Sequence, residues 1–226
     1  MRILFLGRKD VWGLNAYEHL CRIGADVTAI WSNKRYEALP NSILNWKGDY
    51  LFSFYSYYII PKILLDQIKI CINFHPSSPE HAGSGMLNWA LYNKEKYYGA
   101  TAHLIEEKID SGKILKVKRF KILKNDDINS LKYRAKIYCT FLFYEIIQEL
   151  LISKKSINNL LETSANENWS EEAKSIKEIN AMSKINKDIE KNELKHRIRA
   201  FHTDDYPVEL EIHGEKFIHV KDTNYL

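Results

Sequence analysis

An asparagine and a histidine with chemically useful side chains stand two positions apart near the end of an apolar run. Asn73 and His75 close this run, and Pro76 follows directly. In an extended chain such residues point to the same face, and the proline prevents the segment from continuing as a central strand. An amide N–H can stabilise a developing oxyanion, and an imidazole can polarise a carbonyl or take a proton. The pair alone does not establish a site, because a histidine at a strand end often only hydrogen-bonds its own loop.

A carboxylate follows in a polar turn. Asp110 lies in the segment 106–112, between the runs 99–105 and 113–122, which alternate as strands. An aspartate there can orient an imidazole and stabilise its charged form, but an Asp before Ser-Gly is also a common turn residue. His103, on the strand before the turn, is expected to pack or to support the loop. The histidines lack metal-ligand spacing, so we expect no metal site.

Short apolar runs that alternate with helical patterns must position these side chains. The runs 2–6, 25–31, 49–54 and 68–74 are predicted strands. Strands that alternate with helices predict an α/β fold with a mostly parallel, Rossmann-like sheet flanked by helices. Ligands of such sheets bind beyond the carboxyl ends of the strands. Gly7 stands alone after the first run, without a Gly-x-Gly-x-x-Gly pattern, so a dinucleotide cofactor is not expected.

The second half of the chain begins with a long expected helix that ends near residue 151. It carries an aromatic stripe that favours a core or interface position: Tyr138, Phe141, Phe143 and Tyr144. Residues 153–187 are polar, and 188–201 recover helical spacing. We therefore expect a catalytic domain over 1–163, a linker over 164–187 and a small C-terminal element over 188–226.

This C-terminal element should contain a helix and a β-hairpin. The runs 208–212 and 216–220 alternate around a His-Gly-Glu turn. A lone hairpin is marginally stable in water and must pack on the main domain or on another subunit. We expect it to pack on a second copy of the chain, giving a homodimer.

Composition narrows the class of protein. The chain has 226 residues with a formal net charge of +4, too small and too dispersed to indicate nucleic-acid binding. The N-terminal segment lacks the features of a signal peptide, and no stretch approaches the roughly 20 apolar residues of a membrane-spanning helix. The three cysteines are far apart, which suits a reducing compartment. We expect a cytoplasmic protein that binds neither nucleic acid nor membrane.

The order of motifs between about residues 51 and 120 resembles the formyltransferases that use N10-formyltetrahydrofolate. That family carries Asn-x-His-Pro-Ser, a Gly/Pro loop, Trp-Ala on a helix, Gly-x-Thr-x-His and Ile-Asp-x-Gly-x-Ile. The corresponding residues here are Asn73/His75/Pro76/Ser77, Gly83, Trp89-Ala90, Gly99/Thr101/His103 and Ile109-Asp110-Ser111-Gly112-Lys113-Ile114. No single element persuades alone; five in order are difficult to obtain by chance.

The resemblance implies roles for these residues. Asn73 would donate to the formyl oxygen, His75 would act as polariser or base, and Asp110 would orient His75 or relay the proton. N10-formyltetrahydrofolate would be the co-substrate. The residues implied to bind it are Tyr57, Tyr58, Ile59, Glu106, Lys108 and Ile109.

The loop 75–85 narrows the acceptor. It departs from the Leu-Leu-Pro form of methionyl-tRNA formyltransferase and resembles the Pro-Pro-Glu-x-x-Gly-x-Gly form of the sugar N-formyltransferases. These enzymes formylate nucleotide-linked amino-deoxysugars, such as dTDP-4-amino-4,6-dideoxyglucose, for O-antigen or other surface polysaccharide. The segment Ile198-Arg199-Ala200 resembles theirs too. The residues implied to bind the nucleotide sugar are Arg8, Lys9, Asp10, Pro79, Gly83, Gly85 and Met86.

Two alternatives stay open. Glycinamide ribonucleotide formyltransferase has a similar length, but its loop keeps the Leu-Leu-Pro form. A nucleotide-sugar binding module that has lost catalysis would be expected to have a damaged Asn73, His75 and Asp110 set, which is intact here.

Overall fold

The computed structural model describes residues 1–35, 37–83, 85–171, 173–204 and 206–220. The chain divides into two compact units. The first comprises residues 1–80, 99–119 and 135–169, and the second comprises 81–98, 120–134 and the chain from residue 170 onwards. The predicted boundaries at 163 and 187 stay a prediction.

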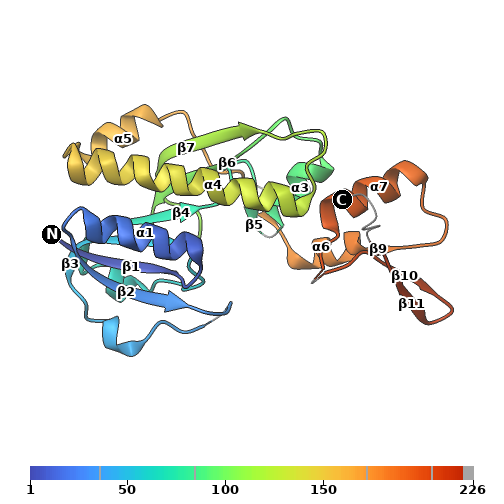
Figure 1. Ribbon diagram of the computed structural model, residues 1–226, viewed down its shortest axis with the longest axis horizontal. Helices are drawn as coiled ribbons and strands as arrows, with labels where there is room; N and C mark the ends of the chain where they lie inside the picture. The colour runs from blue at the N-terminus through green and yellow to red at the C-terminus, as the bar shows by residue number, and fades with distance from the viewer. Residues whose placement is uncertain (36, 84, 172, 205, 221–226) are drawn as a thin grey trace. The chain divides into compact units, whose positions relative to one another are not determined.

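A six-stranded sheet in the order β2-β1-β3-β4-β6-β7 forms the centre of the fold (Figure 1). The strands are β1 (Arg2–Arg8), β2 (Asp26–Ser32), β3 (Gly48–Phe54), β4 (Ile68–His75), β6 (Tyr97–Leu104) and β7 (Ile114–Lys121). The first four pair in parallel, whereas β6 runs antiparallel to β4. The predicted α/β fold with a mostly parallel sheet flanked by helices is confirmed.

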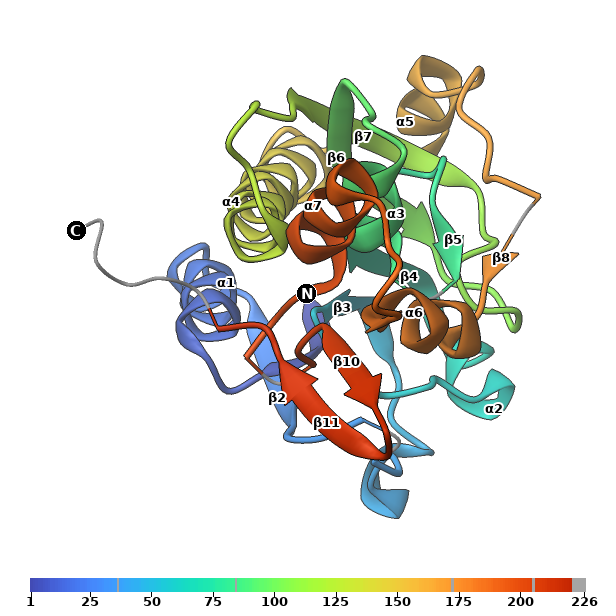
Figure 2. The ribbon, with the colours of Figure 1, turned by 90° about the vertical axis from the view of Figure 1, so that its right-hand side faces the viewer.

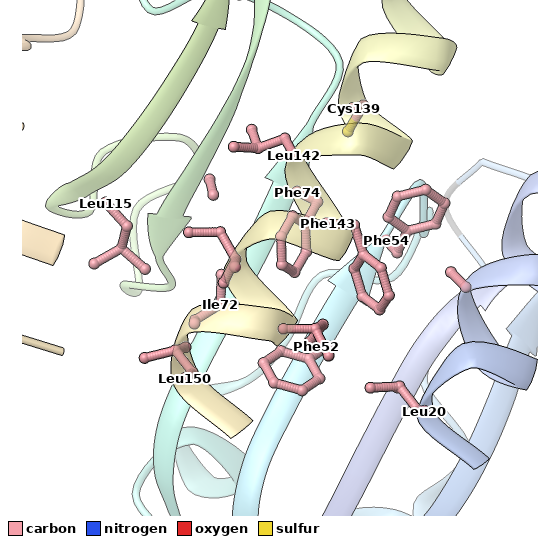
Figure 3. Packing of buried hydrophobic residues seen from close by; sticks show 14 of the residues in the cluster. Leu20, Phe52, Phe54, Ile72, Phe74, Leu115, Cys139, Leu142, Phe143 and Leu150 are labelled. Carbon is pink, nitrogen blue, oxygen red and sulfur yellow. The ribbon is translucent and has the colours of Figure 1, made fainter. Parts of the chain in front are cut away.

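Helices α1 (Val11–Arg22) and α4 (Ile128–Ile147) cover one face of this sheet (Figure 1). Phe143 of α4 is fully buried among aromatic rings from three strands. Its ring centroid lies 4.9–6.3 Å from those of Phe5, Phe52, Phe54 and Phe74 (Figure 3). Such edge-to-face contacts stabilise the core beyond the effect of burial alone. Phe141 of the same predicted stripe is 52% exposed, so only part of the stripe enters the core.

The opposite face of the sheet has a smaller apolar cluster. Leu4, Leu6 and Leu51 point to this side because alternate residues of a strand face opposite ways. They pack against a 3₁₀ turn, η1 (Asn41–Ile43), and a short helix, α2 (Lys62–Leu65).

Helix α4 continues into a π-helical turn, η2 (Gln148–Ile152), before α5 (Ile157–Thr163). The segment 164–187, expected as a linker, holds two short strands, β8 (Ala173–Lys174) and β9 (Lys184–Ile185), and the helix α6 (Ile176–Ser183). Ser175 and Glu178 form a reciprocal capping box that starts α6. The polar composition hid this local helix signal.

The second unit holds the remaining elements. Helix α3 (Met86–Tyr92) packs on α7 (Lys191–Phe201), where Asn88 Nδ2 donates to the carbonyl oxygen of Ala200 at 2.6 Å. A two-residue strand, β5 (Ala82–Gly83), pairs with β8. The expected hairpin forms from β10 (Glu209–Ile212) and β11 (Glu215–Ile218), with β9 as a third strand (Figure 2). Its turn places His213 and Gly214 at positive φ. Residues 221–226 of the predicted C-terminal element lie outside the described residues.

No helix in the described ranges is both long enough and apolar enough to cross a membrane.

Candidate active site

The antiparallel pairing of β4 and β6 places Asn73 directly opposite His103. Asn73 Nδ2 lies 3.1 Å from His103 Nε2, and His103 Nδ1 lies 2.8 Å from the carbonyl oxygen of Leu104. A carbonyl can only accept, so Nδ1 carries a hydrogen. Nε2 lies between the Asn73 amide and Asp110 Oδ1: without a hydrogen it accepts from Asn73, and with one it donates to the carboxylate. One N–H of Asn73 is held in this way, and the second N–H of the amide can bind another acceptor.

Asp110 faces two histidines. Its Oδ1 lies 3.7 Å from His75 Nδ1 and 3.5 Å from His103 Nε2. The structure therefore brings together all three residues expected to carry catalysis. The His75–Asp110 distance is longer than a hydrogen bond, a common feature of active sites without substrate.

The turn that carries Asp110 is tightly built. Asp110 has φ +48°, in the left-handed region, which Asp and Asn tolerate better than most residues. Ser111 Oγ donates to the carbonyl oxygen of Lys108 at 2.8 Å. A Cβ at Gly112 would stand 1.8 Å from the carbonyl oxygen of Leu104, so only glycine fits there.

Burial and charge set the protonation of the site. Burial lowers the pKa of His75 below its ordinary value, His103 adds to this effect, and the carboxylate of Asp110 opposes it. For Asp110, burial alone would raise the pKa, but the interactions with His103 and His75 outweigh it and hold the pKa below the ordinary range. The site thus holds an ionised carboxylate next to an imidazole that is neutral at neutral pH.

A cavity of about 390 Å³ opens beside these residues. Asn73, His75, His103 and Asp110 line it. All six residues expected to hold the co-substrate line it as well: Tyr57, Tyr58, Ile59, Glu106, Lys108 and Ile109. Other lining residues were not among the predicted site residues: Arg35, Ser53, Ser56, Ile60, Ile105 and Glu107. Isolated Ser and Arg residues carry no local sequence signal.

A cluster of charges lies at the carboxyl end of β1. Arg8 Nε and Lys136 Nζ lie 4.0 and 3.9 Å from Asp10 Oδ2, and the other oxygen of Asp10 caps α1 by accepting from the Gly13 amide. The Arg8 guanidinium lies over the Tyr57 ring, 4.7 Å from its centroid. The neighbouring Lys9 is exposed.

This cluster lies on the same edge of the sheet as His75. The register pairs Gly7 with Phe54 and Phe54 with Phe74, so Arg8 and His75 end strands that are separated only by β3. Neighbouring strands are about 4.8 Å apart, so two spacings, about 10 Å, separate the two backbones.

Residues 30–140 match the family model described as formyl transferase. These residues belong to the formyl transferase family. The segment includes Asn73, His75 and Asp110, together with every predicted donor-site residue.

Curated relatives align with this formyl transferase segment over part of their length. A methionyl-tRNA formyltransferase from Thermodesulfovibrio yellowstonii is 35% identical over 94 residues, which are 41% of this chain and 30% of the relative. The chain spans less than half the length of the first curated relatives it matches.

Solved structures share the fold of this chain over nearly its whole length. A 4-N formyltransferase from Francisella tularensis has a TM-score of 0.76 at 18% identity, with 97% of both chains covered. An N-formyltransferase from Helicobacter canadensis, in complex with folinic acid and dTDP-3-aminofucose, has a TM-score of 0.70 at 22% identity, covering 94% of this chain and 84% of that chain.

The residues predicted to bind the acceptor divide between the two units. Arg8, Lys9, Asp10 and Pro79 belong to the first unit, whereas Gly83, Gly85 and Met86 belong to the second. Gly85 has φ +69°, and a Cβ there would meet the Ile179 side chain. Ser84, in the same predicted loop, lies outside the described residues.

Two residues make contacts at the site that the sequence analysis did not predict. His103 was expected only to pack or support a loop, yet it contacts both Asn73 and Asp110. Trp169 lies in the polar region after α5, and its ring meets those of His103 and His75. In the described ranges, no group of three or more His, Cys, Asp or Glu side chains is arranged to hold a metal ion.

Proposed function

We propose that the chain is a folate-dependent sugar N-formyltransferase. It transfers the formyl group of N10-formyltetrahydrofolate to the amine of a nucleotide-linked amino-deoxysugar, such as dTDP-4-amino-4,6-dideoxyglucose, for O-antigen or other surface polysaccharide. The observation that carries the proposal is the meeting of Asn73, His75 and Asp110 at one end of the 390 Å³ cavity.

The donor occupies that cavity. The segment Tyr57–Ile60 lines it on one side, and Glu106–Asp110 contributes the turn that carries the carboxylate. A flat heterocycle fits between such backbone segments, whose N–H and C=O groups fix its orientation. The Helicobacter canadensis relative, which has the same fold, was crystallised with folinic acid.

The reaction needs one oxyanion donor and one proton acceptor. The acceptor's amine nitrogen forms a bond to the formyl carbon, and the formyl oxygen becomes an oxyanion. The N–H of Asn73 that does not face His103 donates to this oxygen. His75 takes a proton from the amine and returns it to N10 as the bond from N10 to the formyl carbon breaks. Asp110 stabilises the imidazolium in between.

The charge cluster at β1 suits the acceptor's diphosphate. Arg8 and Lys136 carry two positive charges, and Asp10 carries one negative charge, so the cluster has a net positive charge. The backbones of Arg8 and His75 are about 10 Å apart, so the sugar attached to a diphosphate held at Arg8 would extend along the strand ends towards His75. Guanidinium and ammonium groups are the usual partners of phosphate oxygens.

Purified protein tests the proposal directly. It should formylate a dTDP-linked amino sugar with N10-formyltetrahydrofolate as donor, followed by mass spectrometry of the product. His75→Asn and Asp110→Asn should nearly abolish turnover without changing the melting temperature. His213→Asn, in the exposed hairpin turn, should leave turnover unchanged. Activity of either site variant within about tenfold of wild type would contradict the assignment.

Two other acceptors are measured in parallel. Methionyl-tRNA is favoured by the 35% identity to a methionyl-tRNA formyltransferase. Glycinamide ribonucleotide is the other alternative. Faster formylation of either one than of every sugar nucleotide would replace the sugar assignment. Tight sugar-nucleotide binding without formyl transfer to any acceptor would indicate a binding module.

We also propose that the chain is a cytoplasmic homodimer without nucleic-acid or membrane partners. Edge strand β11 is exposed along its length, with Phe217 and Ile218 at 55% and 57% exposure. An exposed apolar edge strand tends to pair with another chain. Light scattering at micromolar concentration should give twice the monomer mass, and Phe217→Lys should halve it.

A further inference from the structure

We propose that Trp169 is a positioning residue of the histidine site: it covers His75 and His103 against water and ties the Asp110 turn to them. The inference rests on the proposed function for its catalytic consequence. No motif of the sequence singled out this tryptophan, and it lies outside the segment 30–140 that matches the formyl transferase family.

The indole meets both imidazoles edge to face. Its ring centroid lies 4.9 Å from that of His103 with an interplanar angle of 87°, and 6.2 Å from that of His75 with an angle of 68°. Trp169 does not line the 390 Å³ cavity, although both histidines do. The indole therefore adds to the burial of both imidazoles without lining the cavity itself.

The indole N–H adds a directional contact. Trp169 Nε1 donates to the carbonyl oxygen of Gly112 at 2.8 Å. Gly112 is buried two residues after Asp110, at the point where a Cβ cannot be accommodated. The same side chain thus packs on the histidines and holds the turn that carries their carboxylate partner.

The backbone that precedes Trp169 is anchored within the first unit. Glu167 forms a bidentate pair with Arg119, at 2.6 and 2.7 Å, and Arg119 also pairs with Glu80. Ser164 Oγ donates to the carbonyl oxygen of Ile114 at 2.5 Å. Anchors on β7 thus fix the segment 164–169, and the indole is held in place before substrate binds.

This cover has an electrostatic consequence for His75. The charged and titratable groups that face His75 are Asp110, from the turn, and His103, from β6. Burial outweighs the attraction of Asp110 and lowers the pKa of His75. Removal of the indole admits water, which weakens the burial effect and leaves the attraction of Asp110 in place.

Nuclear magnetic resonance titration tests the role without any substrate. The His75 imidazole signal is assigned as the one missing from His75→Asn. In Trp169→Ala the pKa of His75 should rise, and in Trp169→Phe, which keeps a ring but loses the N–H, it should rise by a smaller step. Trp46→Phe is the matched control, because the Trp46 indole donates to Thr28 Oγ1 at 3.3 Å outside the site.

Turnover provides the second measurement. Trp169→Ala should lower kcat by about 100-fold, the effect expected when catalytic groups are displaced by about 1 Å, with KM for both substrates nearly unchanged. A His75 pKa equal to wild type in folded Trp169→Ala and Trp169→Phe would overturn the proposal. If Trp169→Ala does not fold, an unchanged pKa of His75 in Trp169→Phe would by itself overturn the proposal. If wild type forms no product, the proposed function fails, but the titration still decides the role of Trp169.

Discussion

Asn73 Nδ2 lies closer to His103 Nε2, at 3.1 Å, than His75 lies to Asp110, at 3.7 Å. Of these two contacts, the cross-strand pair is the one within hydrogen-bond distance. His103 fixes the amide plane of Asn73, so that the second N–H of the amide has one preferred direction. The His75–Asp110 pair is left to shorten when the imidazole becomes charged.

Removal of His103 should weaken catalysis through Asn73. His103→Ala should lower kcat about tenfold, the effect of one lost hydrogen bond, and Asn73→Ala about 100- to 1000-fold, the effect of a lost oxyanion donor. The double variant should be no slower than Asn73→Ala alone, as steady-state kinetics would measure. Rate losses that multiply would contradict the orienting role. His103→Gln, which supplies an acceptor oxygen, should recover part of the rate.

The acid limb of the pH–rate profile should lie below pH 6.5. Burial lowers the pKa of His75, and the neutral ring is the form that takes the proton. Asp110 stays ionised across this range because its interactions with the histidines, set against burial, depress its pKa. The profile of kcat/KM against pH measures this limb. A midpoint above 6.5 would indicate that Asp110 outweighs burial.

The stability of the fold should also decrease as the pH falls below 6.5. A histidine with a depressed pKa in the folded state favours folding fully above pH 6.5 and loses that effect as pH falls towards its folded pKa, because the unfolded chain takes up the proton first. Between pH 7 and pH 5, wild type should therefore lose more melting temperature than His75→Asn. Equal losses would mean that His75 titrates normally.

Occupancy of the β1 charge cluster should depend on Lys136. Lys136→Met should raise KM for the sugar nucleotide about tenfold and leave KM for the folate unchanged, because one charge-assisted contact to the diphosphate is lost. Lys132→Met, at an exposed position of the same helix, is the matched control. An unchanged KM in Lys136→Met would place the diphosphate elsewhere.

The two phenylalanines of α4 should differ sharply in their effect on stability. Phe143→Ala should lower the free energy of unfolding by about 3–5 kcal/mol, because it leaves a void among four aromatic rings. Phe141→Ala, at a side chain that is 52% exposed, should change it by less than about 1 kcal/mol. Urea denaturation of both variants measures the contrast, and similar losses would contradict the packing of α4.

The sequence predicted the parts of the site that depend on local order. The strand end at Asn73 and His75 and the turn at Asp110 lie in short segments with Gly, Pro or Asp signals, and the residues expected to bind the co-substrate line the cavity. Their roles stay a prediction. The partnership of Asn73 and His103 was not predictable, because it requires the antiparallel direction and register of β6. The direction of β6 depends on the path of the chain between β4 and β6, and it cannot be predicted from the residues of β6 alone.

Trp169 and α6 escaped prediction for a related reason. Both lie in a polar region whose average composition suggested a linker. Composition averages over a window, whereas α6 depends on one capping pair and Trp169 on a single anchored position. The exposure of Phe141 beside the buried Phe143 is likewise decided by the direction in which α4 meets the sheet.

Position 110 must satisfy two requirements: its residue must adopt a left-handed backbone conformation, and its side chain must be a carboxylate. Only a few residue types tolerate this conformation at low cost, and only a carboxylate supplies the charge. A substitution at this position can therefore act through the backbone conformation as well as through the lost charge. Replacement by alanine would confound backbone strain with lost charge, while asparagine separates them.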